Sequence, residues 1–219
     1  MIFFNRLTYA LKYVVFLENV LKYSVLVMEV VMLTVGDKFP SFSLTAIADM
    51  PADKMNMDNA FCTINNDSYN GMWKVIFFYP KDFTFVCPTE IIGFANILQE
   101  FRARNAQILG CSIDSEFVHW AWKKHHKPLN NLNFPLMSDI RRELSAQLGI
   151  LDADSGVAKR ALFIVDSVGE IKFVMVTDMG IGRNPTEVLR VLDALQTGEL
   201  CQCGWIKGDN TIDTKNATV

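Results

Sequence analysis

A short apolar run followed by a helical pattern limits most strongly what this chain can fold into. Residues 74–79 read KVIFFY, which is typical of a buried β-strand, and a turn follows them. Beyond the turn, apolar residues recur at helical spacing: Ile91, Ile92, Ala95, Leu98 and Phe101. Pro88 suits the first helical position, because its missing N–H would be unbonded there. The pattern predicts a strand that leads through a turn into a helix.

Strands and helices alternate along the rest of the chain. The further strands that the sequence predicts are 107–113, 162–165 and 171–177, with a hairpin-like turn at 166–169. The further helices end near 125, 148 and 195, and their starts are marked by Asp114 or Ser115, by Asp139, and by Asn184 with Pro185. Gly149 and Gly198 stand just past two of these ends. This order predicts an α/β fold with a central mixed β-sheet flanked by helices.

Composition and charge exclude several classes of protein. The chain has 219 residues, of which 50% are hydrophobic and 21% charged, enough for one globular domain with a full core. The net charge is −3 and no block of lysine and arginine occurs, which argues against a nucleic-acid partner. Five cysteines form no regular disulfide framework, so we expect a reducing compartment and a cytoplasmic location.

Cys87 is the candidate nucleophile. It directly precedes Pro88 at the predicted helix start, where unpaired backbone N–H groups and the helix dipole favour an anion, here the thiolate. The alternative is that Cys87 is a small buried hydrophobe, as most cysteines are. Two neighbours favour the reactive interpretation. Thr84 is close enough for its hydroxyl to donate to the sulfur, and Pro80 ends the strand and can shield the thiol from water.

The stretch FFYPKDFTFVCPTE resembles the active-site signature of the peroxiredoxins of the alkyl hydroperoxide reductase C and thiol-specific antioxidant type. The resemblance extends from about Leu33 to Asp213. It implies a thioredoxin-like fold and a thiol-dependent peroxidase that reduces hydrogen peroxide and organic hydroperoxides, an antioxidant activity that needs no cofactor. The implied partners are the peroxide, a protein disulfide reductant (thioredoxin, a flavoprotein reductase or an adaptor) and a second copy of the chain, in a homodimer that assembles into a higher ring.

The resemblance also assigns roles to single residues. Cys87 matches the peroxidatic cysteine, and Pro80 and Thr84 match its companions. The catalytic arginine of the family corresponds to Arg160, and Glu90 with Arg183 would support it. In the implied mechanism Cys87 attacks the peroxide and becomes a sulfenic acid, which a second thiol converts to a disulfide.

Two cysteines near the C-terminus are candidates for that second thiol. Cys201 matches the resolving cysteine, which the family contributes from the partner subunit, while Cys203 resembles the extra thiol of three-cysteine actinobacterial forms. Which of the two resolves is open. A metal site at this Cys-x-Cys pair is disfavoured, because structural zinc needs four ligands. Spacing alone leaves His119 and His126 open as partners, yet they stand in a helix-like stretch that we expect to be partly solvated.

Two other functions are compatible with parts of the sequence. A dithiol oxidoreductase would need Cys-x-x-Cys at the strand-to-helix turn, where this chain has Glu90 in the second position. A holdase chaperone is an alternative that no residue supports directly.

The first 31 residues differ from the remainder. They are apolar but interrupted by charges, with no uncharged run near the roughly 18 residues of a membrane span and no signal-peptide cleavage site. An interfacial amphipathic helix is one alternative. We expect instead that residues 1–31 are an extension outside the domain. The peroxiredoxin domain is then 32–198, and a tail at 199–219 carries the resolving cysteine.

Overall fold

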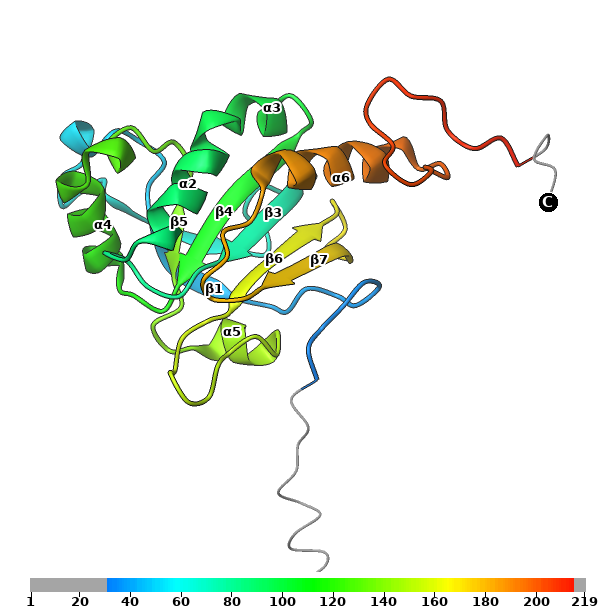
Figure 1. Ribbon diagram of the computed structural model, residues 1–219. Coiled ribbons are helices and arrows are strands. Elements are labelled where there is room, and N and C mark those ends of the chain that lie inside the picture. The colour runs from blue at the N-terminus through cyan, green and yellow to red at the C-terminus, as the bar shows by residue number, and fades with distance from the viewer. Residues whose placement is uncertain (1–30, 215–219) are drawn as a thin grey trace, which may run out of the picture. The chain divides into compact units, whose positions relative to one another are not determined.

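The computed structural model describes residues 31–214. The expectation for residues 1–31 therefore lies almost entirely outside the described part, while residues 32–214 belong to one unit (Figure 1). Within residues 31–214, no helix is both long and apolar enough to cross a membrane.

A seven-stranded sheet forms the centre of this unit (Figure 1). The strand order is β2-β1-β5-β4-β3-β6-β7. β3, β4 and β5 are parallel, whereas β1, β2, β6 and β7 pair antiparallel with their neighbours. The strands are β1 (Ser43–Ile47), β2 (Phe61–Asn65), β3 (Trp73–Phe78), β4 (Ala106–Ser112), β5 (Leu136–Ser138), β6 (Arg160–Val165) and β7 (Ile171–Thr177). The predicted mixed sheet is thus confirmed.

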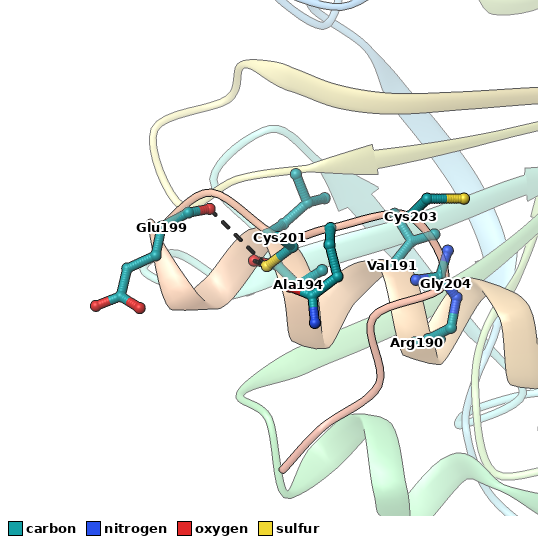
Figure 2. Close-up of a pocket in the computed structure, with 9 residues that line it drawn as sticks. Arg190, Val191, Ala194, Glu199, Cys201, Cys203 and Gly204 are labelled. Carbon is teal, nitrogen blue, oxygen red and sulfur yellow. Dashed lines mark hydrogen bonds between the residues drawn. The ribbon is translucent and has the colours of Figure 1, made fainter. Parts of the chain in front are cut away.

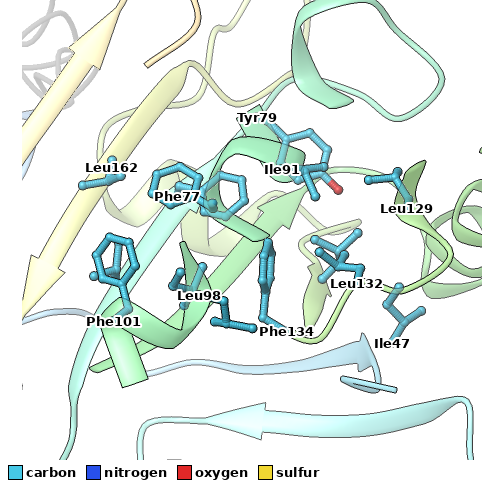
Figure 3. Packing of buried hydrophobic residues seen from close by; sticks show 14 of the residues in the cluster. Ile47, Phe77, Tyr79, Ile91, Leu98, Phe101, Leu129, Leu132, Phe134 and Leu162 are labelled. Carbon is cyan, nitrogen blue, oxygen red and sulfur yellow. The ribbon is translucent and has the colours of Figure 1, made fainter. Parts of the chain in front are cut away.

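Helices cover both faces of the sheet. They are α2 (Val86–Asn96), α3 (Leu98–Arg102), α4 (Glu116–His125), α5 (Glu143–Gln147) and α6 (Pro185–Thr197), with short 3-10 turns η1 (Ala52–Lys54) and η2 (Lys127–Leu129). On one face Phe77 and Tyr79 of the β3 segment pack with Ile91 of α2 (Figure 3). Phe94 of α2 and Leu192 of α6 belong to the same cluster. The other face buries a second cluster beneath α5. The side chains of alternate β3 residues therefore pack into two separate hydrophobic clusters.

Most predicted elements occur within one or two residues of their expected bounds, but four details differ from the prediction. Val86 begins α2, so Pro88 is its third residue, and the helix is interrupted at Ile97 before α3 continues. The helix expected from Asp139 begins only at Glu143, because the Asp139 carboxylate accepts hydrogen bonds from the Leu144 and Ser145 backbone N–H groups across an intervening turn. The short strands β1, β2 and β5 were not predicted.

The last helix was predicted closely, and its ends show why. Asn184 accepts a hydrogen bond from the Thr186 N–H at 3.0 Å, and Pro185 occupies the first helical position. Gly198 ends the helix with φ = 68°, in the left-handed region that favours glycine. α6 packs against α2 and leads directly into the C-terminal segment (Figure 1).

Candidate active site

Cys87 lies at the point where β3 leads through a loop into α2. It is the second residue of the helix, and its side chain is fully buried. No side chain caps the start of α2, and its first turn holds no acidic residue. The free N–H groups and the positive end of the helix dipole are therefore available to an anion at the sulfur.

Arg160, the first residue of β6, contacts Cys87 directly. Its Nη1 donates to Cys87 Sγ at 3.4 Å and to Glu90 Oε2 at 2.7 Å. Its Nε donates to the Met179 carbonyl at 2.6 Å, and the residue is almost fully buried. The antiparallel pairing of β3 with β6 brings Arg160 to this end of the sheet. The guanidinium is thus held by three acceptors, of which the sulfur is one.

A second arginine completes the charged cluster beneath the thiol. Arg183 donates from Nε to Glu90 Oε1 at 2.6 Å and from Nη2 to Oε2 at 3.0 Å. Its backbone N–H also donates to Glu90 Oε1, at 2.9 Å. Counting formal charges, one carboxylate and two guanidiniums leave one positive charge in a site closed to water. A thiolate at Cys87 would neutralise that charge.

Pro80 and Thr84 occupy the loop before Cys87. Pro80 is buried, while Thr84 is half-exposed. The expected contact from Thr84 to the sulfur was wrong for this state, because the hydroxyl donates to the Lys81 carbonyl at 2.9 Å. A hydroxyl has a single proton, so this bond leaves Thr84 Oγ1 as an acceptor only.

Sequence reasoning missed two residues, one within this loop and one beside it. Asp82 is buried and pairs with His119 of α4, which was expected to be partly solvated but has no exposed surface. The sequence held a signal for the burial of His119, because His119, Trp122 and Lys123 recur at the spacing of one helix face. In the structure that face is buried.

The two C-terminal cysteines lie beyond α6, beside a surface groove of about 500 Å³ (Figure 2). Cys201 is half-buried, with Sγ 3.5 Å from Thr197 Oγ1 and 3.9 Å from the Ala194 carbonyl. Cys203 is exposed. Trp205 is buried and anchors the segment, because its carbonyl accepts from Arg190 Nη1 at 2.7 Å.

Within residues 31–214, no cation lies beside either of the other two cysteines. Cys111 lies in β4, and burial raises the pKa of its thiol well above the usual value. Burial and the charge of Asp49 raise the pKa of Cys62. All five cysteines are free thiols. Among residues 31–214, no three histidine, cysteine or carboxylate side chains gather as a metal site.

A buried thiol at a helix start, in contact with an arginine and placed on a mixed sheet of this topology, defines the class of thiol peroxidases. The chain belongs to the AhpC/TSA family, whose sequence model matches residues 35–174. It is accordingly a peroxidase of the peroxiredoxin type.

Named relatives agree with this assignment. The chain is 54% identical to alkyl hydroperoxide reductase C of Mycobacterium tuberculosis over 185 residues, which cover 83% of this chain and 94% of the relative. It is 41% identical to peroxiredoxin-2 of Cricetulus griseus over 185 residues, covering 81% and 89%.

Solved structures confirm the thioredoxin-like fold. Mycobacterium tuberculosis AhpC superposes with a TM-score of 0.74 at 53% identity, covering 80% of this chain and 99% of that one. The reduced 2-Cys peroxiredoxin of Plasmodium vivax gives a TM-score of 0.74 at 35% identity, covering 82% and 92%.

Proposed function

We propose that Cys87 is the peroxidatic nucleophile of this peroxidase and that hydrogen peroxide and organic hydroperoxides are its substrates. The observation that carries the proposal is the 3.4 Å contact between Arg160 Nη1 and Cys87 Sγ above an otherwise uncompensated positive charge. Of the five cysteines, Cys87 alone combines a helix start with a hydrogen bond from a guanidinium.

The reaction follows from this geometry. The Cys87 thiolate attacks the terminal peroxide oxygen, the O–O bond breaks, and the products are Cys87 sulfenic acid and an alkoxide or hydroxide. A proton from solvent converts the latter to the alcohol or water. Arg160 stabilises the thiolate and the charge that develops on the leaving oxygen. Thr84 Oγ1, as an acceptor, and the first N–H groups of α2 orient the peroxide, while Pro80 excludes water.

A second thiol must then displace the hydroxyl of the sulfenic acid, which releases water and leaves a disulfide. Within one subunit Cys201 is far from this site. Gly182 and the start of α6 pack on α2, whereas Cys201 packs on the last turn of α6. The 13 residues between these ends span about 20 Å, against the ~7 Å between Cα atoms that a disulfide allows.

The second thiol therefore comes from a second copy of the chain in this proposal. Cys201 is the resolving cysteine of a homodimer that assembles into a higher ring, and Cys203 is the alternative resolver or a relay. The first turn of α2 unwinds and the anchored C-terminal segment is released when the disulfide forms. A protein disulfide reductant, either thioredoxin, a flavoprotein reductase or an adaptor, then restores the thiols. We place this cycle in the cytoplasm, where such reductants operate.

The test is peroxide consumption by matched cysteine variants. Cys87→Ser should abolish consumption, whereas Cys62→Ser should leave it unchanged, because Cys62 has no cation beside it and the pKa of its thiol is raised. Substantial consumption by Cys87→Ser, or its loss in Cys62→Ser, would refute the assignment.

A further inference from the structure

Lys74, the second residue of β3, is a buried lysine that the peroxidase chemistry does not use. The residue is 7% exposed, and within residues 31–214 its ammonium group makes neither a hydrogen bond nor an ion pair. The other buried lysine of this part of the chain, Lys123, differs, because its ammonium donates to three backbone carbonyl oxygens. Lysines are almost never buried without a partner. The Lys74 ammonium therefore retains three unused N–H donors.

The Lys74 side chain borders a cavity of about 350 Å³, which we call the Lys74 pocket. Lys74 shares a face of β3 with Ile76, so the pocket adjoins the hydrophobic cluster beneath α5. This volume lies near the lower end of the range for small-molecule sites, roughly 300–1,000 Å³. The lining combines apolar side chains with charged and polar groups and includes Lys38, Phe39, Phe42, Asn70, Lys74 and Val168.

Hydrogen bonds hold the apolar walls of the pocket in place. The Phe39 N–H donates to the Gly169 carbonyl at 2.9 Å, which fastens this segment to the turn between β6 and β7. The Phe42 N–H donates to Asn66 Oδ1 at 2.7 Å, and the rings of Phe39 and Phe42 pack edge to face with centroids 5.9 Å apart. Because the walls are fixed by contacts within the chain, a ligand does not have to order them when it binds.

Asp166, the carboxylate that acts most strongly on Lys74, is bonded to other groups. Its Oδ1 accepts from the Val168 and Glu170 backbone N–H groups at 3.0 and 2.9 Å, and its Oδ2 lies 3.6 Å from Lys172 Nζ. Asp166 therefore lowers the net positive charge around the pocket without using the donors of Lys74.

A second lysine supplies further donors at the rim of the pocket. Lys38 is exposed, and its ammonium donates to the Val168 carbonyl at 3.3 Å, which leaves two N–H groups unused. The charges of Asp166 and Asp67 offset part of the positive charge at Lys74. This balance favours a ligand with one negative charge over a dianion such as phosphate.

We propose that the Lys74 pocket binds a small organic monocarboxylate, whose charged group accepts hydrogen bonds from Lys74 and Lys38 and whose apolar part packs against Phe42. The inference does not depend on the role of Cys87. Lys74 lies near the start of β3, whereas the loop to Cys87 follows the other end of the strand, about 15 Å away. A ligand in the pocket leaves the access of peroxide to Cys87 open.

The probe is 4-bromobenzoate, which carries one carboxylate on a flat apolar body and a bromine that anomalous X-ray scattering locates. We expect calorimetry to show one site per chain, and crystals to show the bromine in the Lys74 pocket. The neutral 4-bromobenzamide should bind at least about 10-fold more weakly, because it forms no charge-assisted hydrogen bond. Absence of binding, a bromine elsewhere or equal affinity for the amide would overturn the proposal, as would tighter binding of inorganic phosphate.

Variants connect the affinity to the two lysines. Lys74→Met should weaken 4-bromobenzoate binding by about 10- to 100-fold, the effect of losing a charge-assisted hydrogen bond. Lys54→Met, at an exposed lysine outside the pocket, is the matched control and should bind as the wild type does. Lys38→Met keeps the backbone pairing with Glu170 and should weaken binding by about 2- to 5-fold, as loss of an exposed charge does.

Unchanged affinity in Lys74→Met would contradict the assignment. If Lys74→Met does not fold, the affinity of Lys38→Met and the position of the bromine decide the question. Cys87→Ser should bind 4-bromobenzoate as the wild type does, and the probe should leave the rate of the wild type with hydrogen peroxide unchanged. Competition between the probe and peroxide would place the probe at Cys87 and overturn the proposal, whereas inactivity of Cys62→Ser would refute the peroxidatic role of Cys87 alone.

Discussion

One nitrogen of Arg160 serves both Cys87 and Glu90: Nη1 lies 3.4 Å from Cys87 Sγ and 2.7 Å from Glu90 Oε2. The direction of the guanidinium toward the thiol therefore depends on the carboxylate behind it. Arg183 holds the same carboxylate from the opposite side, so the position of the thiol's charge partner is fixed by a buried network.

Removing the guanidinium from Cys87 should slow the first chemical step. We expect Arg160→Met to lower the rate of peroxide reaction by about 100- to 1,000-fold, as loss of one preorganised donor does. Glu90 keeps its three bonds to Arg183, so the fold should persist. The measurement is stopped-flow peroxide reaction with circular dichroism as the folding check. Arg141→Gln, at an exposed arginine, should react as the wild type does; a wild-type rate in Arg160→Met would exclude the role.

Removing the carboxylate should instead affect stability. Glu90→Gln leaves two buried guanidiniums without a counter-charge, so we expect the free energy of unfolding to fall by about 3–5 kcal/mol. Glu187→Gln breaks a partly exposed pair with Arg190 and should cost less than about 1 kcal/mol. Urea denaturation measures both variants. Equal small losses would show that the buried network contributes no more than a surface pair.

The fold was predictable where local signals agree with tertiary packing. The hairpin of β6 and β7 and the capped helix α6 were found. In both cases the turn or cap residues and the spacing of the apolar residues indicate the same element. The strands β1, β2 and β5 were not found. β5 has only three residues, and buried and exposed side chains alternate only weakly along β1 and β2. The pairing of these strands therefore depends on partners that are distant in the sequence.

The site was predictable to the extent that it is local. Pro80 and Cys87 flank one strand-to-helix loop, and the family resemblance supplied Arg160 from a strand far away in sequence. The direction of the Thr84 hydroxyl and the burial of His119 could not be read, since both depend on which backbone carbonyls the fold places nearby. Sequence spacing identifies a helix face but not the groups opposite to it.

Lys123 should make the folding stability of the enzyme depend on pH in the alkaline range. Its ammonium is fully buried and donates to the Ala48, Met50 and Leu132 carbonyls, and burial lowers its pKa to about 8, partly offset by Asp49. Between about pH 8 and 10.5 the unfolded chain binds more protons here than the folded one, so this residue makes stability rise with pH in that window.

The measurement is the difference in unfolding free energy between the wild type and Lys123→Met across that window. Stability of the wild type relative to Lys123→Met should increase from about pH 8 to 10.5. Lys127→Met, at an exposed lysine nearby, is the matched control. A flat difference for Lys123→Met would mean that the Lys123 ammonium titrates alike in the folded and the unfolded enzyme.

The order of reaction at the two C-terminal thiols should follow their packing. Cys201 is held against the last turn of α6, so its reaction requires release of the segment that Trp205 anchors, whereas Cys203 is already exposed. We expect Trp205→Ala to increase hydrogen exchange at residues 200–205 and to speed disulfide formation after one equivalent of peroxide.

Mass spectrometry should then find an intersubunit Cys87–Cys201 link in the wild type and a Cys87–Cys203 link in Cys201→Ser. A Cys87–Cys203 link as the main wild-type product would assign the resolving role to Cys203, and disulfide formation no faster in Trp205→Ala would show that release of the segment does not limit resolution.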